Sequence, residues 1–315
     1  MRIAPKLALC VFILAWPVGL TQAQNLAPRA YVITPIHTNA LTLTYSFTDG
    51  SIFLNGAVPA TNTSGQTYTS VFAYFHTLSV FGRSANVTAS LPYGVGNFQG
   101  TIMSSETTVH RSGMVGVAIR FSVNLLGGPA MDLKHFREWR QKTILGVSLS
   151  VVPPTGQYDP SKLINLGVNR WAFKPELGYS RRWHSWLLDG YAGAWLFTKN
   201  PDYFSRNRFF TGTNTQSQRP IASFEGHLSY DFKRRLWASL DSNLWVGGRT
   251  SINGVENTKT LQENSRIGTT LSVPVPKSKH QSLKFSYSRG AYVRFGGDFQ
   301  VTSVAWQYTW LGRPN

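Results

Sequence analysis

The sequence predicts an all-β protein, a transmembrane antiparallel up-and-down β-barrel of about twelve strands over residues 24–315, with a cleaved signal peptide at 1–23. Three observations predict this fold. Apolar and polar residues alternate with period two through most of the chain. Aromatic residues are frequent while charged residues are scarce. The connections between the alternating segments are long and short in turn, as in bacterial outer-membrane barrels.

The N-terminal segment has the pattern of a signal peptide. A short basic start precedes an apolar stretch at 7–20, and Thr21-Gln22-Ala23 places small residues where a signal peptidase cleaves. We place cleavage after Ala23. An N-terminal membrane anchor is the alternative, although the stretch is short for the ~30 Å core of a bilayer. Cys10, the only cysteine, lies in this segment, so the exported chain would meet an oxidising compartment without a thiol.

The composition separates a membrane barrel from a nucleic-acid binder. The formal net charge is +17, yet only 14% of residues are charged and 13% are aromatic. An ordinary soluble domain has ~25% charged residues. Few charges and many aromatic side chains suit a surface that meets lipid and its interface, so we expect no nucleic-acid partner.

The alternation predicts the positions of the strands. In 41–47, 115–125 and 224–231 every second residue is apolar, which gives a strand one apolar and one polar face. Most such segments reach the ~9–11 residues that a tilted strand needs to cross a bilayer. The predicted strands are 39–48, 67–80, 84–95, 112–126, 142–153, 170–181, 184–198, 218–232, 235–247, 264–275, 281–290 and 300–311.

The connections predict which end of the barrel each loop occupies. Short turns lie near 81–83, 182–183, 233–234 and 276–280. One connection on the same side, 127–141, is longer, and its apolar spacing suggests a short amphipathic helix, with an irregular turn as the alternative. The connections that we expect to be long, on the outer side, are 49–66, 96–111, 154–169, 199–217, 248–263 and 291–299.

Tryptophan residues cluster near the ends of the predicted strands, as in the interfacial girdles of membrane barrels. The last strand alternates up to Trp310, which is similar to the terminal strand that the barrel-assembly machinery recognises, although residues 311–315 extend beyond it. The candidates for the girdles are Trp171, Trp183, Trp186, Trp195, Trp237, Trp245, Trp306 and Trp310.

Two segments resemble a known family. VVPPTGQYD at 151–159 and NLGVNRWAFKPELG at 165–178 resemble the "meta-pathway of phenol degradation" outer-membrane proteins, and weaker similarity extends over nearly the whole mature chain. The resemblance implies a transporter or channel for small, often aromatic, compounds. It supplies neither a substrate nor site residues, and it implies no cofactor.

The expected lumen is narrow and mixed in charge. Eight strands leave an interior filled by side chains, and sixteen or more leave a water channel, so about twelve strands favour a narrow pore with passive diffusion. Charged side chains on the inward face could either select solutes by direct contact or form ion pairs that brace the wall. The candidates that line the lumen are Arg120, Lys174, Glu176, Asp189, Glu225, His227, Asp241 and Lys284.

Other functions need different observations. An outer-membrane hydrolase would need a nucleophile beside a base, and His227 and Ser229 share a face, but neighbours on one face of a strand are ~6–7 Å apart. We therefore expect no catalysis, no metal site and no cofactor. A structural or adhesive barrel without transport is the main alternative. The expected partners are outer-membrane lipid, a small solute and the assembly machinery.

Overall fold

The computed structural model describes residues 26–53, 60–102, 105–207 and 210–312. The predicted signal peptide and its cleavage after Ala23 lie outside the described residues. Within them, helices are short, and none has the length and apolar character of a membrane span. The described chain is almost entirely antiparallel sheet, which confirms the predicted all-β class.

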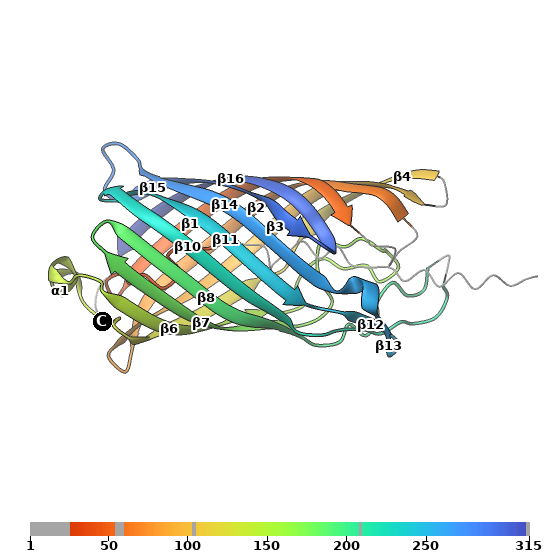
Figure 1. Cartoon of the computed structure of the whole chain (residues 1–315), viewed down its shortest axis with the longest axis horizontal. Helices are drawn as coiled ribbons and strands as arrows, with labels where there is room; N and C mark the ends of the chain where they lie inside the picture. The colour runs from red at the N-terminus through yellow and green to blue at the C-terminus, as the bar shows by residue number, and fades with distance from the viewer. Residues whose placement is uncertain (1–25, 54–59, 103–104, 208–209, 313–315) are drawn as a thin grey trace, which may run out of the picture.

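One antiparallel sheet closes into a barrel of twelve strands, as predicted (Figure 1). Each strand pairs with its neighbours in chain order, and the ring closes through the pairing of β1 with β16. Its strands are β1 (Thr38–Phe53), β2 (Ala60–Val80), β3 (Arg83–Ile102), β4 (Ser105–Met114) with β5 (Ala118–Leu126), β6 (Thr143–Val152), β7 (Ala172–Trp183), β8 (Trp186–Phe197), β10 (Ile221–Lys233), β11 (Leu236–Gly247), β14 (Gln262–Pro274), β15 (Gln281–Val293) and β16 (Gly296–Leu311).

The alternation in the sequence places side chains on opposite faces of the wall. Along β11 the burial pattern alternates, so that Asp241 is buried while its neighbours Leu240 and Ser242 are exposed. Leu240 is 68% exposed on the outer face, and apolar side chains of the remaining strands around the ring line the same face. Closure of the ring pairs the spanning strands with both neighbours, and the wall offers hydrocarbon an apolar outer face.

The fourth strand of the ring is interrupted, which corrects the predicted continuous strand 112–126. β4 and β5 are separated at 115–117, where Gly116 has φ +130°. The connection after β6 crosses this break: Gln157 N–H donates to the Met114 carbonyl (2.7 Å), and Val117 N–H donates to the Thr155 hydroxyl (2.8 Å). A Cβ on Gly156 would lie 2.4 Å from the Val115 carbonyl oxygen, so the crossing requires glycine there.

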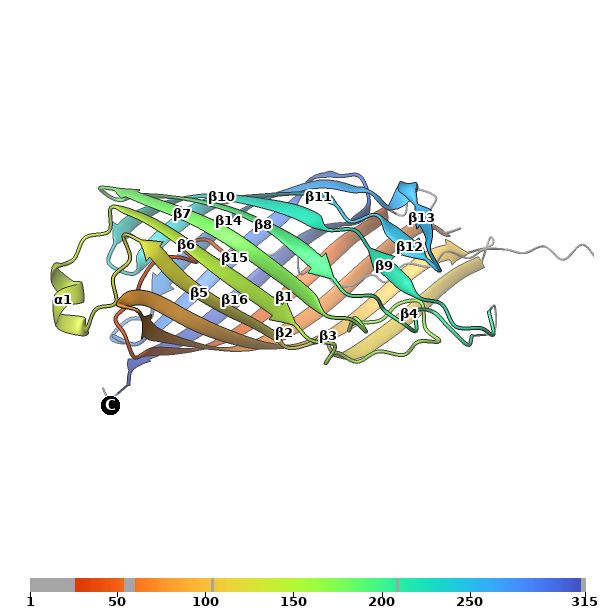
Figure 2. The ribbon, with the colours of Figure 1, turned by 90° about the horizontal axis from the view of Figure 1, so that it is seen from below.

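The two ends of the barrel differ (Figure 2). We call one the short-turn end, which holds 81–82, 127–142, 184–185, 234–235 and 275–280, and the other the long-loop end, which holds 153–171, 198–220 and 248–261. The long loops contain a small sheet that was not predicted, made of β9 (Gln216–Gln218), β12 (Thr250–Ile252) and β13 (Val255–Asn257), followed by a 3-10 turn at Thr258–Thr260.

Three of the connections predicted to be long are mostly strand. Within 49–66, 96–111 and 291–299, β1 continues to Phe53, β4 begins at Ser105, and β15 and β16 are separated only by 294–295. Much of these extensions is rich in Ser, Thr, Asn and Gly. Because both faces of such a segment are polar, the alternation that marks a membrane strand is absent, and the backbone pairing is not visible in the sequence.

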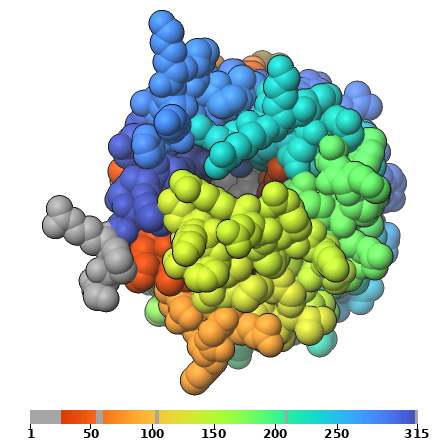
Figure 3. Space-filling view, turned by 90° about the vertical axis from the view of Figure 1, so that its left-hand side faces the viewer, coloured from red at the N-terminus to blue at the C-terminus, as the bar shows by residue number. Residues whose placement is uncertain are grey.

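The predicted amphipathic helix at the short-turn end is confirmed as α1 (Leu133–Glu138). Asp132 caps it by accepting from His135 N–H (2.8 Å). Seen from this end, the yellow-green segment around α1 and the cyan turn after β10 cover much of the face, and a hollow remains between them (Figure 3). The end of the barrel is therefore covered in part, and beside the cover its surface is hollowed.

Candidate functional site

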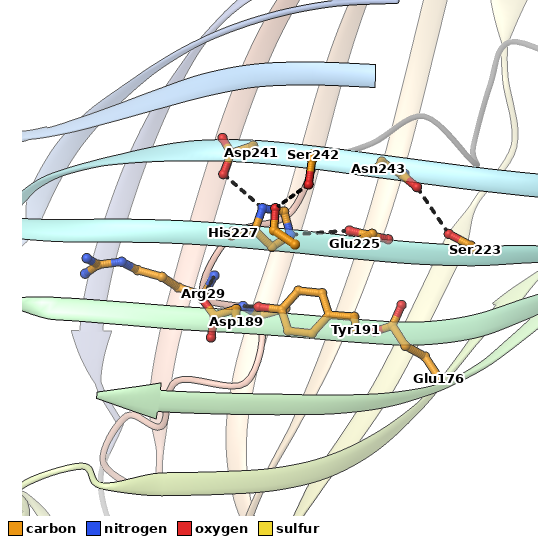
Figure 4. Close-up of polar contacts among 12 residues, drawn as sticks. Arg29, Glu176, Asp189, Tyr191, Ser223, Glu225, His227, Asp241, Ser242 and Asn243 are labelled. Carbon is orange, nitrogen blue, oxygen red and sulfur yellow. Dashed lines mark hydrogen bonds and ion pairs between the residues drawn. The ribbon is translucent and has the colours of Figure 1, made fainter. Parts of the chain in front are cut away.

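The inner wall formed by β7, β8, β10 and β11 carries most of the buried charge of the barrel. The register sets His227 on β10 directly opposite Asp189 on β8 and Asp241 on β11. Because directly opposed residues lie on the same face of a sheet, all three point inward together. Figure 4 shows Asp241 directed toward His227, and Asp189, on the next strand, beside Arg29.

Six of the eight predicted residues form one chain of contacts, which we call the charge network. Lys174 Nζ lies 2.6 Å from Glu176 Oε2 and 2.8 Å from Glu225 Oε1. The other Glu225 oxygen is 3.6 Å from His227 Nε2. The network consists of Arg120, Lys174, Glu176, Glu225, His227 and Asp241.

The ends of the charge network are also paired. His227 Nδ1 lies 2.9 Å from Asp241 Oδ1, and Asp241 Oδ2 accepts from the Thr270 hydroxyl (2.9 Å). At the other end Arg120 Nη2 is 3.6 Å from Glu176 Oε1. Acidic and basic groups thus follow one another along the wall, and a buried charge that is paired costs far less than an isolated one.

A segment before β1 lies against the inner wall near the short-turn end. We call residues 26–37 the strap. The Tyr31 hydroxyl donates to Glu176 Oε1 (3.0 Å), and the Arg29 N–H donates to Asp189 Oδ2 (3.2 Å). A Cβ added to Gly178 would lie 2.0 Å from the Tyr31 ring, so the ring packs directly on the backbone of β7.

The strap is also tied to the segment that covers the short-turn end. Tyr31 and Ile33 pack with Ile144 and Tyr191, and Met131, Phe136 and Trp139 pack against this cluster. The Ile36 N–H donates to the Met131 carbonyl (2.8 Å). The strap and the α1 segment therefore narrow the lumen together.

The remaining two predicted residues lie outside the charge network. Asp189 accepts from the strap, as described above. The Lys284 Nζ lies 5.7 Å from the centre of the Trp237 ring, and the Arg29 guanidinium lies 4.1 Å from the same ring. The structure thus brings Asp189 to the strap and places Lys284 beside Trp237, while the six others meet.

A second cluster of inward side chains lies toward the long-loop end, which we call the aromatic tier. Its buried members are Val152, Ala172, Trp195, Ile221 and Trp245, with Phe197 packed against them. This corrects the girdle prediction for three residues: Trp195, Trp237 and Trp245 are 6%, 9% and 1% exposed, and they face inward. Trp171, Trp183 and Trp186 lie exposed on the outer face, as a girdle requires.

Sequence reasoning missed the strap and the aromatic tier for different reasons. The strap has no period and no motif, so nothing in 26–37 indicated it. The tier had a signal, because Trp245 is an even number of residues from Asp241 and must share its face. A tryptophan near a strand end fits a girdle and an inward cluster alike, and only this parity separates the two.

The arrangement around His227 differs from a hydrolase site. Its two ring nitrogens face Asp241 and Glu225, whereas a Ser-His pair needs one nitrogen directed at the hydroxyl. Ser229 lies two residues farther along the same strand. In the described residues no group of three His, Cys, Asp or Glu side chains has the geometry to hold a metal ion.

Comparisons with known proteins give one family and one fold. A family profile described as "Putative MetA-pathway of phenol degradation" matches residues 46–300. No curated protein matches the chain. The COG4313 outer membrane channel from Pseudomonas putida F1 has a TM-score of 0.72 at 15% identity, covering 91% of this chain and 100% of that chain.

Two other solved structures are similar to a lower degree. The β-domain of the Bordetella autotransporter Brka has a TM-score of 0.47 at 12% identity, covering 86% of this chain and 99% of that chain. The CymD monoaromatic hydrocarbon channel has a TM-score of 0.44 at 8% identity, covering 89% of this chain and 90% of that chain. The likeness to the COG4313 channel establishes an outer-membrane type of β-barrel.

Proposed function

The chain belongs to the MetA-pathway of phenol degradation family, and from this premise we propose that it is an outer-membrane channel through which small aromatic or hydrophobic compounds diffuse passively. The resemblance at 151–178 is thereby confirmed by the match over 46–300. The family name links the chain to aromatic compounds, and the COG4313 protein, which shares its fold, is an outer membrane channel. Both support transport.

The observation that carries the proposal is the contrast between the two faces of the closed wall. The outer face presents residues such as Leu240 and Phe224, 68% and 50% exposed, while the inner face buries a connected set of charges. A buried charge network facing a lumen is favourable where water or a polar solute reaches it. Twelve strands enclose a wider interior than the one that side chains fill in an eight-stranded barrel, so this polar inner face leaves room for a passage.

The size of the solute follows from what occupies the lumen. Twelve strands enclose more than the filled interior of an eight-stranded barrel, and the strap and the α1 segment take up part of that space at one end. We therefore propose a solute of the size of one aromatic ring, with the charge network bracing the wall beside its path.

The location and assembly of the barrel follow from the same proposal. Residues 1–23 would direct export across the inner membrane, and lipid would contact the apolar outer face. The assembly machinery would recognise β16, which ends at Leu311 and pairs with β1 to close the ring. The short-turn end would face the periplasm and the long-loop end the outside.

Permeability of the purified barrel tests the proposal. We expect the refolded protein to give discrete single-channel conductance in planar bilayers, and to release or admit phenol-sized solutes in liposome swelling. The matched control is a liposome of the same lipid treated with the same detergent but without the protein. A barrel that folds by circular dichroism but conducts no ion and passes no small solute would overturn it. Release of fatty acid from detergent-solubilised lipid would instead indicate the hydrolase.

A further inference from the structure

Trp195 of the aromatic tier and Arg170 beside the tier each have a buried donor that lacks an acceptor among the described residues. Arg170 is 8% exposed; its Nη2 donates to Gln218 Oε1, while its Nη1 has no hydrogen-bond partner in that part of the chain. Trp195 is 6% exposed, and its indole Nε1 also has none there. Because a buried donor without an acceptor is costly, such groups in a native protein call for an explanation.

The two donors belong to one surface. The Arg170 guanidinium lies 4.4 Å from the centre of the Phe197 ring, and the Phe197 and Trp195 rings stack at 6.5 Å with an interplanar angle of 10°. Trp195 packs against Ile221, which pairs with it across the strands. A cation and an indole N–H therefore border a shared aromatic surface.

The charge of Arg170 has no ionic partner among the described residues. Among the ion pairs of the described residues none includes Arg170, whereas the nearby Lys174 is held by two carboxylates. Burial lowers the pKa of Arg170 to about 10, and the group still carries its charge at neutral pH. The tier therefore presents one cation without an ionic partner in the described chain, beside apolar rings.

Trp245 shows that an indole in the same tier can be satisfied by the protein. It is 1% exposed, and its Nε1 donates to Gln262 Oε1 (2.9 Å). Within the described residues, the indole N–H of Trp245 thus has an acceptor, while that of Trp195 in the same cluster has none. The difference singles out the Trp195 side of the tier.

We propose that this side of the aromatic tier is a binding subsite for a small aromatic anion, with the solute ring against Trp195 and Phe197 and its anionic oxygen accepting from Arg170 Nη1 and Trp195 Nε1. The inference rests on the proposed function, since it names the class of solute that the channel selects. Aromatic carboxylates and phenolates share this chemistry, a planar ring with an anionic oxygen in its plane. Stacking and a charged hydrogen bond act together on such a molecule.

Binding of benzoate to the purified barrel in detergent, followed by calorimetry and tryptophan fluorescence, tests the subsite. Removing a hydrogen bond to a charged group weakens binding by ~10-fold or more, so Arg170→Gln should weaken benzoate by that factor. Trp195→Phe keeps a ring and removes only the N–H, and should weaken it severalfold. Trp245→Phe is the matched control and should leave the affinity within about twofold.

The choice of probe separates charge from shape. Benzamide, which is neutral, and cyclohexanecarboxylate, which lacks the aromatic ring, should both bind more weakly than benzoate. 4-Nitrophenol, whose ionisation crosses neutral pH, should bind more tightly as the pH rises if phenolates are accepted. Tightening would assign phenolates to the subsite as well as carboxylates; no change would restrict it to carboxylates.

Conductance measured on the same preparations keeps the two proposals distinguishable. Wild-type protein that conducts but binds no benzoate would overturn the subsite and leave the channel intact. Equal losses in Trp195→Phe and Trp245→Phe would also overturn it, because the donor would then not matter. If benzoate binds and the effects follow Arg170 and Trp195 while no solute passes, the subsite stands and the channel fails.

Discussion

The charge network and the aromatic tier occupy neighbouring levels of the same inner wall, yet their charged groups are paired to different degrees. In the network, Lys174, Glu225 and Asp241 each have partners at 2.6 to 2.9 Å. In the tier, Arg170 Nη1 and Trp195 Nε1 are buried and have no acceptor in the described residues. In the network the charges are paired within the protein, although Arg120 Nη2 and His227 Nε2 approach carboxylate oxygens only to 3.6 Å. In the tier the two donors face no carboxylate among the described residues.

The difference assigns separate work to the two levels. A network whose charges are already paired has little to offer a solute. Removing one of its members leaves the charge of the partner buried and unpaired. A tier with unused donors on an aromatic surface can interact with a solute that supplies an acceptor. The network would therefore hold the wall in shape, while selection would take place at the proposed subsite, nearer the long-loop end.

The largest expected effect comes from breaking the charge network. Lys174→Met removes the cation that lies between Glu176 and Glu225, and an uncompensated buried charge typically costs ~3–5 kcal/mol of stability. Urea unfolding in lipid vesicles should show the loss, and the double change Lys174→Met with Glu225→Met should recover part of it. Lys284→Met, outside the network, is the matched control and should cost little. A stability for Lys174→Met within ~1 kcal/mol of wild type would contradict a bracing role.

A smaller effect is expected when a charge is added on the outer face, one residue away from Asp241. Leu240 neighbours Asp241 but faces outward, and Arg near the middle of the lipid face of a barrel costs ~2–4 kcal/mol. Leu240→Arg should therefore lower the unfolding free energy in vesicles by about this amount. Ser242→Arg, exposed on the same face and nearer the long-loop end, provides a positional comparison. An unchanged stability for Leu240→Arg would mean that this face does not meet lipid.

The sequence predicted the barrel because its main signal is local. All twelve predicted strands overlap a strand of the ring, because a wall with lipid outside imposes period two on each strand. The same logic selected the eight charged candidates, without showing which six would form the network. Contacts such as that of Lys174 with Glu225 depend on the register of strands far apart in the chain.

The features that the sequence did not reveal have no such local rule. Tyr31 in the strap is held by Ser148 and Glu176, over a hundred residues away, and no pattern around it indicates this. The break at 115–117 depends on the crossing by Gly156, which only the folded loop provides. The small sheet of β9, β12 and β13 consists of three-residue strands, too short for a periodic signal.

A substitution in the strap tests whether the lumen is narrow on the short-turn side of the charge network, away from the aromatic tier. Tyr31→Ala removes a ring that packs on Gly146 and Gly178, and it opens space within the lumen. We expect the unitary conductance in planar bilayers to rise severalfold. Tyr45→Ala, which removes a ring that is 54% exposed on the outer face, is the control and should leave conductance unchanged. An identical conductance for Tyr31→Ala and wild type would place the constriction elsewhere.

The smallest expected effect concerns the loop between β6 and β7, which leads to Arg170 at the tier. The pKa of Asp159 is lowered from 3.8 to about 2, most by the hydrogen bond from the Ser161 hydroxyl and next by the one from Lys162. Because the pKa is lower in the folded loop, the stabilisation is complete above 3.8 and is lost as the pH falls toward 2. Amide hydrogen exchange of 159–165, corrected for intrinsic rates, should therefore accelerate between pH 5 and pH 2 (an interval of about three units around these values).

Asp159→Asn separates this titration from a general loosening of the loop. The amide cannot ionise, so its exchange should show no step over the same range, although the Asp159 N–H to Asn165 Oδ1 bond (2.9 Å) can remain. If the loop also orders Arg170, benzoate affinity, corrected for the protonation of benzoate itself over this range, should fall together with the protection of 159–165 in the wild type and stay level in the variant. A loss of protection with the same pH profile in both proteins would show that Asp159 does not set it.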